Sequence, residues 1–245
     1  MILGLEIIYR DDDIIVINKP SGLLAVPGRG IDKQDCIVSR VKKLFPNCIE
    51  QPSVHRLDMD TSGLMVLAFT KEAHRHLSIQ FQDGTVEKKY IAVLDGVIGK
   101  GCNFENVNAK KLAPSNDCTN LSVGLSQNEG TFELPFRLDV ENRPHQIYDN
   151  IFGKIGITKW KQIRIWKMNN RNVSSVELVP ITGRTHQLRL AAASPLGFGI
   201  PIVGDNLYGS QEDGQRLLLH SSFLSFIHPV TKEKMVFEKE PDFMY

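Results

Sequence analysis

The chain has 245 residues, with 29 Lys and Arg residues against 28 Asp and Glu residues and a formal net charge of +1. A chain of this length buries about 70% of its unfolded surface, so its core needs no disulfide or metal staple. A content of 42% hydrophobic and 23% charged residues is typical of a globular protein rather than a disordered one. No apolar run reaches the roughly 18 residues of a membrane span, and no signal peptide is recognisable. With four unevenly spaced cysteines, the chain is expected to be cytoplasmic.

The beginning of the chain predicts two strands, Glu6–Tyr9 and Ile14–Asn18, because β-branched residues dominate both runs. Lys19–Gly22 predicts a turn, since proline presets φ and glycine tolerates positive φ. Asp35 is then the predicted cap of a short helix, and Pro46 follows its end.

Later elements follow from the same signals. A helix is predicted over Lys71–Gln82 with Thr70 as its cap, and a short helix from about Thr185 to before Pro195. The polar stretch Gly99–Gly130 has no clear periodicity and is interpreted as an elaborated loop or hairpin region. Further strands are predicted at Leu64–Phe69, Lys89–Leu94, Gly156–Trp166, Val173–Val179, Leu217–Ser221 and Lys234–Phe237.

Strands therefore outnumber helices, and they do not alternate with them as regularly as a doubly wound sheet requires. This order predicts an α+β fold with a mixed, largely antiparallel central sheet and flanking helices.

One cluster of polar residues surrounds Asp58, within the run His-Arg-Leu-Asp-Met-Asp-Thr-Ser-Gly-Leu that starts at His55. The simplest interpretation is a turn in which Asp58 or Asp60 bonds its own backbone. A second interpretation is a loop carboxylate beside a cation, as a nucleophile or base would be. The residue types leave both open.

A second cluster covers Thr182–Arg189, where Thr185 could cap a helix and the arginines could meet a phosphate or a carboxylate. The alternative is a solvated helix start. Pro201–Gly209 is interpreted as a strand end and turn that brace this segment. Tyr90, at the start of a strand, fits either a core position or a ring that stacks on a base.

The sequence holds no HExxH, P-loop, GxSxG or GxGxxG pattern, so neither metal catalysis nor a dinucleotide cofactor is expected.

Taken together, these segments resemble the RluA family of RNA pseudouridine synthases, from about Ile7 to Phe243, and most of all its RluA branch. The pairing of HRLDxxTSGL with GRTHQLR is specific. The matching segments are Lys19–Leu23, His55–Asp58, Thr61–Leu64, Lys89–Ala92, Gly183–Arg189, Gly204–Asp205 and Tyr208–Gly209.

The resemblance implies an isomerase that converts uridine to pseudouridine without a metal or organic cofactor. It places the catalytic aspartate at Asp58, the active-site tyrosine at Tyr90, and the basic partner of the aspartate at Arg189. Because the target uridine must leave its stack, Arg56 is a candidate to fill the vacated space.

The resemblance also implies an RNA substrate, expected to be a stem-loop of ribosomal RNA, transfer RNA or both. The enzyme is expected to be a monomer that forms a single catalytic domain over residues 1–245, with no separate N-terminal RNA-binding domain of the S4 type. The residues expected to bind RNA are His55, Arg56, Lys159, Lys161, Arg184 and His186.

Two other functions remain compatible with the sequence. A non-catalytic RNA-binding protein could use the same scaffold, although the catalytic positions are intact. A metal-free glycoside hydrolase would need a second positioned carboxylate, for which Asp60 or Asp205 could be nominated.

Overall fold

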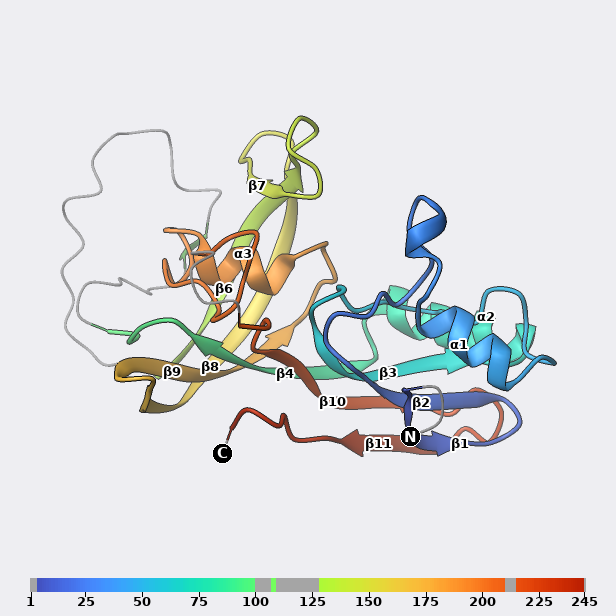
Figure 1. Ribbon diagram of the computed structural model, residues 1–245. Helices are drawn as coiled ribbons and strands as arrows, with labels where there is room; N and C mark the ends of the chain where they lie inside the picture. The colour runs from blue at the N-terminus through green and yellow to red at the C-terminus, as the bar shows by residue number, and fades with distance from the viewer. Residues whose placement is uncertain (1–3, 100–106, 109–127, 210–214, 245) are drawn as a thin grey trace. The chain divides into compact units, whose positions relative to one another are not determined.

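The computed structural model describes residues 4–99, 107–108, 128–209 and 215–244 (Figure 1). The chain divides into two compact units, which we call the first unit (Met1–Tyr90 with Leu219–Tyr245) and the second unit (Ile91–Leu218). The single catalytic domain over residues 1–245 stays a prediction. No helix in the described part of the chain is long and apolar enough to cross a membrane.

The first unit is built on strands in the order β1–β2–β3–β10–β4, with β11 paired to β10. The β1–β2, β2–β3 and β10–β11 pairs are antiparallel, whereas β3 and β10 pair in parallel. The sheet is therefore mixed and largely antiparallel, as predicted. The strands are β1 (Glu6–Arg10), β2 (Ile14–Lys19), β3 (Ser62–Ala68), β4 (Glu87–Leu94), β10 (Leu219–Ile227) and β11 (Lys234–Glu238).

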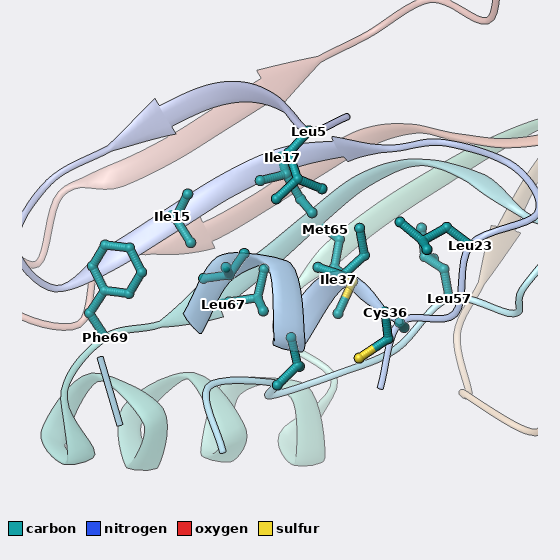
Figure 2. Close-up of a cluster of buried hydrophobic side chains, with 13 residues drawn as sticks. Leu5, Ile15, Ile17, Leu23, Cys36, Ile37, Leu57, Met65, Leu67 and Phe69 are labelled. Carbon is teal, nitrogen blue, oxygen red and sulfur yellow. The ribbon is translucent and has the colours of Figure 1, made fainter. Parts of the chain in front are cut away.

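Helices α1 (Ile37–Leu44) and α2 (Lys71–Asp83) belong to this unit, together with the 3-10 turn η1 (Ile31–Lys33). Successive side chains of a strand point to opposite faces, and β2 and β3 use both. One face contributes Ile15, Ile17, Met65 and Leu67 to a cluster with Ile37 of α1, Leu23 and Leu57 (Figure 2). The other face contributes Ile14, Val16, Leu64 and Val66 to a cluster with Ala73 and Leu77 of α2.

The caps of the two helices differ from the predictions in one case. Thr70 caps α2 as predicted, by accepting a hydrogen bond from the Ala73 backbone N–H at 3.1 Å. The prediction of Asp35 as the cap of α1 was wrong. Cys36 is the cap, and its side chain exchanges bonds with Ser39 in a capping box. Asp35 instead pairs with Arg40, at 2.7 Å.

The second unit orders its strands β4–β9–β8–β6–β5, with β7 paired to β6. Strand β4 belongs to both units, since its last four residues lie in the second. Helix α3 (Gln187–Ala193) lies beside β6 and β8 (Figure 1). The strands are β5 (Val107–Asn108), β6 (Glu129–Leu138), β7 (Gln146–Tyr148), β8 (Lys154–Met168) and β9 (Arg171–Pro180).

Strands β6 and β7 were not predicted, and Pro135 within β6 explains part of the failure, because proline is rare inside strands. The short helix predicted from about Thr185 to before Pro195 is present as α3, but Thr185 is not its cap. The helix begins at Gln187, and His186 precedes it with a left-handed φ of 54°. Most of the polar region Gly99–Gly130 lies outside the described residues.

In the parallel pair of β3 and β10, Gly63 lies opposite Ser221. A Cβ atom at position 63 would lie 2.3 Å from the carbonyl oxygen of Ser221, and the φ of Gly63 is +113°. Only glycine combines this conformation with this contact. The Ser-Gly step of the HRLDxxTSGL motif therefore has a structural cause.

We predict that Gly63→Ala lowers the free energy of unfolding by about 2 kcal/mol or more, from strained φ and lost strand pairing. Urea denaturation measures the loss. Gly22→Ala is the matched control, because the φ of Gly22 is +80° but nothing lies within 4 Å of its Cβ position. Equal losses in the two variants would contradict the close-approach argument.

Candidate active site

Asp58 lies in an irregular segment that leads into β3. The segment begins beside β3, where the Ala68 backbone N–H donates to the Pro52 carbonyl at 2.8 Å. Leu57 is buried in the hydrophobic cluster shown in Figure 2, which also contains Ile37 of α1, and the next residue, Asp58, is half-buried. Thr61 closes a turn by donating its N–H to the Asp58 carbonyl at 3.2 Å. Leu57 thus anchors the turn while Asp58 keeps access to solvent.

A buried ammonium group holds this turn in place. Lys19 has no exposed surface, and its Nζ donates to the carbonyls of Pro20, Leu23 and Met59 at 2.9, 2.6 and 2.7 Å. Burial lowers the pKa of Lys19 to about 8, while the carboxylates of Asp60 and Asp58 oppose that shift. At neutral pH the group is therefore still charged.

Two further bonds join the same pair of turns. Ser21 Oγ donates to the Asp60 carbonyl at 2.7 Å, and the Gly22 N–H donates to the Met59 carbonyl at 3.0 Å. The backbone on the carboxyl side of Asp58 is thus held by three residues of the Lys19–Gly22 turn. Sequence reasoning placed this turn but missed the role of Lys19, for which its position beside a proline gave no signal.

Tyr90 lies in the first unit together with Asp58. Its half-buried ring packs against the hydrophobic cluster that contains Ile37 of α1 and Leu57. Burial raises the pKa of Tyr90 to about 12, an interaction with the Ser221 hydroxyl lowers it, and the negative charge of Asp58 raises it. The phenol is therefore protonated at neutral pH, and Asp58 is close enough to act on it electrostatically.

Arg189 lies in the second unit, in α3, and its side chain is 3% exposed. Its Nε and Nη2 donate to the two carboxylate oxygens of Asp205 at 2.9 and 2.6 Å. Asp205 also accepts the backbone N–H groups of Leu207 and Tyr208. Asp205, within the Pro201–Gly209 segment that was expected to brace this region, thus binds α3 through Arg189, while the assignment of Arg189 as partner of Asp58 stays a prediction.

The turn before α3 carries Arg184 and His186. Arg184 is exposed and donates from Nε to the Ile155 carbonyl at 3.2 Å. His186 Nδ1 lies 2.8 Å from the hydroxyl of Tyr208, which also accepts the Gln146 N–H at 2.8 Å. Tyr208 therefore links the turn to β7, a role that the sequence did not indicate.

Lys159 and Lys161 are exposed side chains of β8. They point away from Trp160, whose ring lies 5.0 Å from that of Phe198. Thr158, on the Trp160 face, bonds Gln187 of α3. The two lysines therefore share the face of β8 that α3 leaves open.

The imidazole ring of His55 is fixed in place by a hydrogen bond and a ring stack. Its Nε2 accepts the Val66 backbone N–H at 3.1 Å, and its ring stacks on Phe81 of α2 with centroids 4.4 Å apart. Burial, with a smaller effect from the charge of Lys88, lowers the pKa of His55 to about 3. The ring is therefore neutral, as it must be for Nε2 to accept a hydrogen bond from the Val66 N–H. Arg56, the next residue, is exposed.

Asp11, Asp13 and His228 bring their ligand-type atoms within 4.8 Å of one another. Both ring nitrogens of His228 are already used. Nε2 lies 2.9 Å from Asp11 Oδ2, and Nδ1 accepts the N–H groups of Val230 and Thr231. This cluster fastens the turn before β2 to the turn after β10, and its donors are not arranged to receive a metal ion.

Comparisons with known proteins agree with the motifs. Residues 13–194 match the family model described as RNA pseudouridylate synthase. The chain is 38% identical over 242 residues to a dual-specificity RNA pseudouridine synthase RluA of Haemophilus influenzae, covering 98% of this chain and 94% of the relative. It is 37% identical to the protein of the same name from Escherichia coli, with the same coverage. Among solved structures, human RNA pseudouridylate synthase domain containing 1 matches with a TM-score of 0.71 and 26% identity, covering 100% of this chain and 86% of that one.

We predict that His55→Phe keeps the ring stack on Phe81 but loses about 1–3 kcal/mol of unfolding free energy at pH 7, because the Val66 N–H is left without its acceptor. Between pH 6.5 and 3 only the unfolded chain protonates His55, so this residue makes stability fall as pH falls. The variant should show a shallower decline in that range.

Urea denaturation from pH 4.5 to 7.5 measures both effects. His76→Phe is the control, since His76 is only half-buried on α2 and its contact with Glu72 lies at the surface, so its loss should cost less than about 0.5 kcal/mol. A variant of His55 that folds like wild type but binds RNA less tightly would instead assign His55 to RNA contact.

Proposed function

The chain belongs to the RluA family of RNA pseudouridine synthases, and we propose that Asp58 is the residue that carries its reaction. The protein is an isomerase that converts uridine in RNA to pseudouridine. The observation that supports Asp58 is its half-buried place on a turn fixed from both sides, by Leu57 in the core and by Lys19 on the Met59 carbonyl.

The reaction detaches uracil at its N1–C1′ bond, turns the base and rejoins it through C5. The C5 proton is lost and N1 regains one, so the net change needs no oxidant, reductant or co-substrate. A carboxylate offers both a nucleophile and a base for this work, as the carboxylates of glycosidases do at an anomeric carbon. Asp58 has the matching chemistry, and no cofactor is part of the proposal.

Two neighbours of Asp58 receive roles in the same proposal. Tyr90, whose hydroxyl is protonated and whose half-buried ring packs against the hydrophobic cluster that contains Ile37 and Leu57, stacks on the target base. Arg56 carries an exposed guanidinium two residues before Asp58 and fills the space that the flipped uridine leaves. Arg189 is assigned to the site by the family motif alone. The proposal also takes residues 1–245 as one catalytic domain.

For the substrate we propose a stem-loop of ribosomal RNA, transfer RNA or both, since the two RluA relatives are named as dual-specificity enzymes. Arg184 and His186 contact this RNA at the turn before α3, and the exposed Lys159 and Lys161 contact its phosphates. The proposed enzyme acts as a cytoplasmic monomer. Mapping pseudouridines by carbodiimide adducts and primer extension, in RNA from cells with and without the gene, identifies the uridine.

We predict that Asp58→Ala lowers turnover at least about 1,000-fold, while folding and RNA binding stay near wild type. Single-turnover assays with excess enzyme measure the chemistry, and gel retardation measures binding. Asp60→Asn removes a charge from the same turn and should remain active. Robust turnover by Asp58→Ala would overturn the catalytic assignment.

We also predict that reversing the charges of Lys159 and Lys161 together flattens the salt dependence of RNA affinity. Each lost phosphate contact removes about 0.7–0.9 from the slope of log affinity against log salt. Binding titrations at 50–300 mM KCl give that slope, with Lys167→Glu as a single-charge reference on the same strand. An unchanged slope would make Lys159 and Lys161 an idle solvated face.

A further inference from the structure

The turn between β7 and β8 presents two large apolar side chains to solvent. Ile151 and Phe152 are 76% and 78% exposed, and Phe152 is the only exposed aromatic side chain among the described residues. Adjacent exposed apolar groups on a soluble protein are a common mark of a binding surface. The established reaction assigns no role to either residue.

The exposure of this turn is enforced by its hydrogen bonds. Asp149 Oδ1 accepts the N–H groups of Ile151 and Phe152, both at 2.9 Å, and the Gly153 N–H donates to the Asp149 carbonyl at 2.9 Å. Arg137 holds the other carboxylate oxygen. A Cβ atom on Gly153 would lie 2.2 Å from the Asp149 carbonyl oxygen, so the turn needs glycine there.

The hydrogen bonds of the Asp149 carboxylate persist at neutral pH, because this group stays ionised there. Arg137 first, and then the two turn N–H groups, lower the pKa of Asp149 to about 2. The Asp149 N–H also donates to the Pro135 carbonyl at 3.1 Å, which fixes the turn to β6. A side chain on such a frame loses little conformational freedom of the backbone when it binds a partner.

The surroundings of the turn favour a polyanion as that partner. Lys154 follows directly and is exposed, and the exposed Arg184 bonds the carbonyl of Ile155. The nearest carboxylate, that of Asp149, is neutralised by Arg137. Apolar tips flanked by cations suit single-stranded nucleic acid, whose bases stack on aromatic rings while its phosphates meet Lys and Arg.

The base of the hairpin is joined to the motif segments of the second unit. His145 Nε2 lies 3.2 Å from the Leu207 carbonyl, and Gln146 donates to the Tyr208 hydroxyl, which also meets His186. The apolar turn therefore has a fixed relation to the GRTHQLR segment, which carries two of the proposed RNA contacts.

We propose that the Ile151–Phe152 turn is an RNA-contacting element, in which Phe152 stacks on an unpaired base of the substrate stem-loop beside phosphates held by Lys154 and Arg184. This inference rests on the proposed RNA contacts of the segment around Arg184. It makes the turn a determinant of which loop the enzyme accepts, separate from the chemistry at Asp58.

The test is RNA affinity of the full-length protein, with a stem-loop oligonucleotide whose uridine the wild-type enzyme converts. Phe152→Ala should weaken binding about tenfold, the range expected for one stacked base, and should leave the salt slope unchanged because no charge is lost. Phe152→Trp should restore affinity. Turnover at saturating RNA should stay within about twofold of wild type, since the turn acts in binding.

Val140→Ala is the matched control, because Val140 is also exposed, at 63%, and lies in the other loop that β7 joins. It should bind RNA like wild type. Thermal melting of all variants checks folding. The melting temperature of Phe152→Ala should equal that of wild type, because the Phe152 ring is exposed. Arg184→Ala should lower the salt slope by about 0.7–0.9, the signature of a lost phosphate contact.

Wild-type RNA affinity in Phe152→Ala, or a loss of turnover without a loss of affinity, would overturn the inference. A wild-type protein that self-associates in light scattering, and becomes monomeric only in Phe152→Ala with RNA affinity unchanged, would make the turn a contact between copies instead. An unaltered salt slope in Arg184→Ala would remove the proposed contact at Arg184 while leaving the result for Phe152 readable.

Discussion

The buried charge of Lys19 is the constraint on which the geometry around Asp58 depends. Burying an ammonium group is costly unless its donors are satisfied, and here three carbonyl oxygens satisfy all of them. Two of these carbonyls, those of Pro20 and Leu23, lie within or directly after the Lys19–Gly22 turn, and the third is that of Met59. Neither turn can move without leaving a buried donor unpaired. The buried charge of Lys19 therefore positions Asp58, which precedes Met59 in a segment without regular secondary structure.

The second unit also contains a buried cation whose hydrogen bonds join two segments, but here the partner is a carboxylate instead of backbone carbonyls. Arg189 and Asp205 form a bidentate pair at 3% and 0% side-chain exposure, and Asp205 uses its remaining capacity on the N–H groups of Leu207 and Tyr208. An arginine alone in such a place would carry an uncompensated charge. The pair connects α3 to the loop after Val203, so the GRTHQLR and GDNLYG motifs are two halves of one buried contact.

The sequence was most informative where local signals agree with the tertiary structure. Helix α2 has a Thr cap, a regular apolar face and a terminal glycine, and all three are observed. It was misleading where two residues compete for one role, as Asp35 and Cys36 do at α1. Cys36 is the N-cap, and Asp35 instead pairs with Arg40. Contacts between distant segments, such as Lys19 with Met59 or Tyr208 with His186, leave no local periodicity and could not be predicted.

The segment around Asp58 shows why a turn and a catalytic carboxylate are not competing interpretations. The turn is closed through the main chain, from the Thr61 N–H to the Asp58 carbonyl. The inward side chains of the same motif, His55 and Leu57, supply the anchoring. The turn and the proposed chemistry can therefore use different atoms of one residue, the carbonyl oxygen and the carboxylate of Asp58. The proposed reaction at the Asp58 carboxylate is thus compatible with a turn at the same residue.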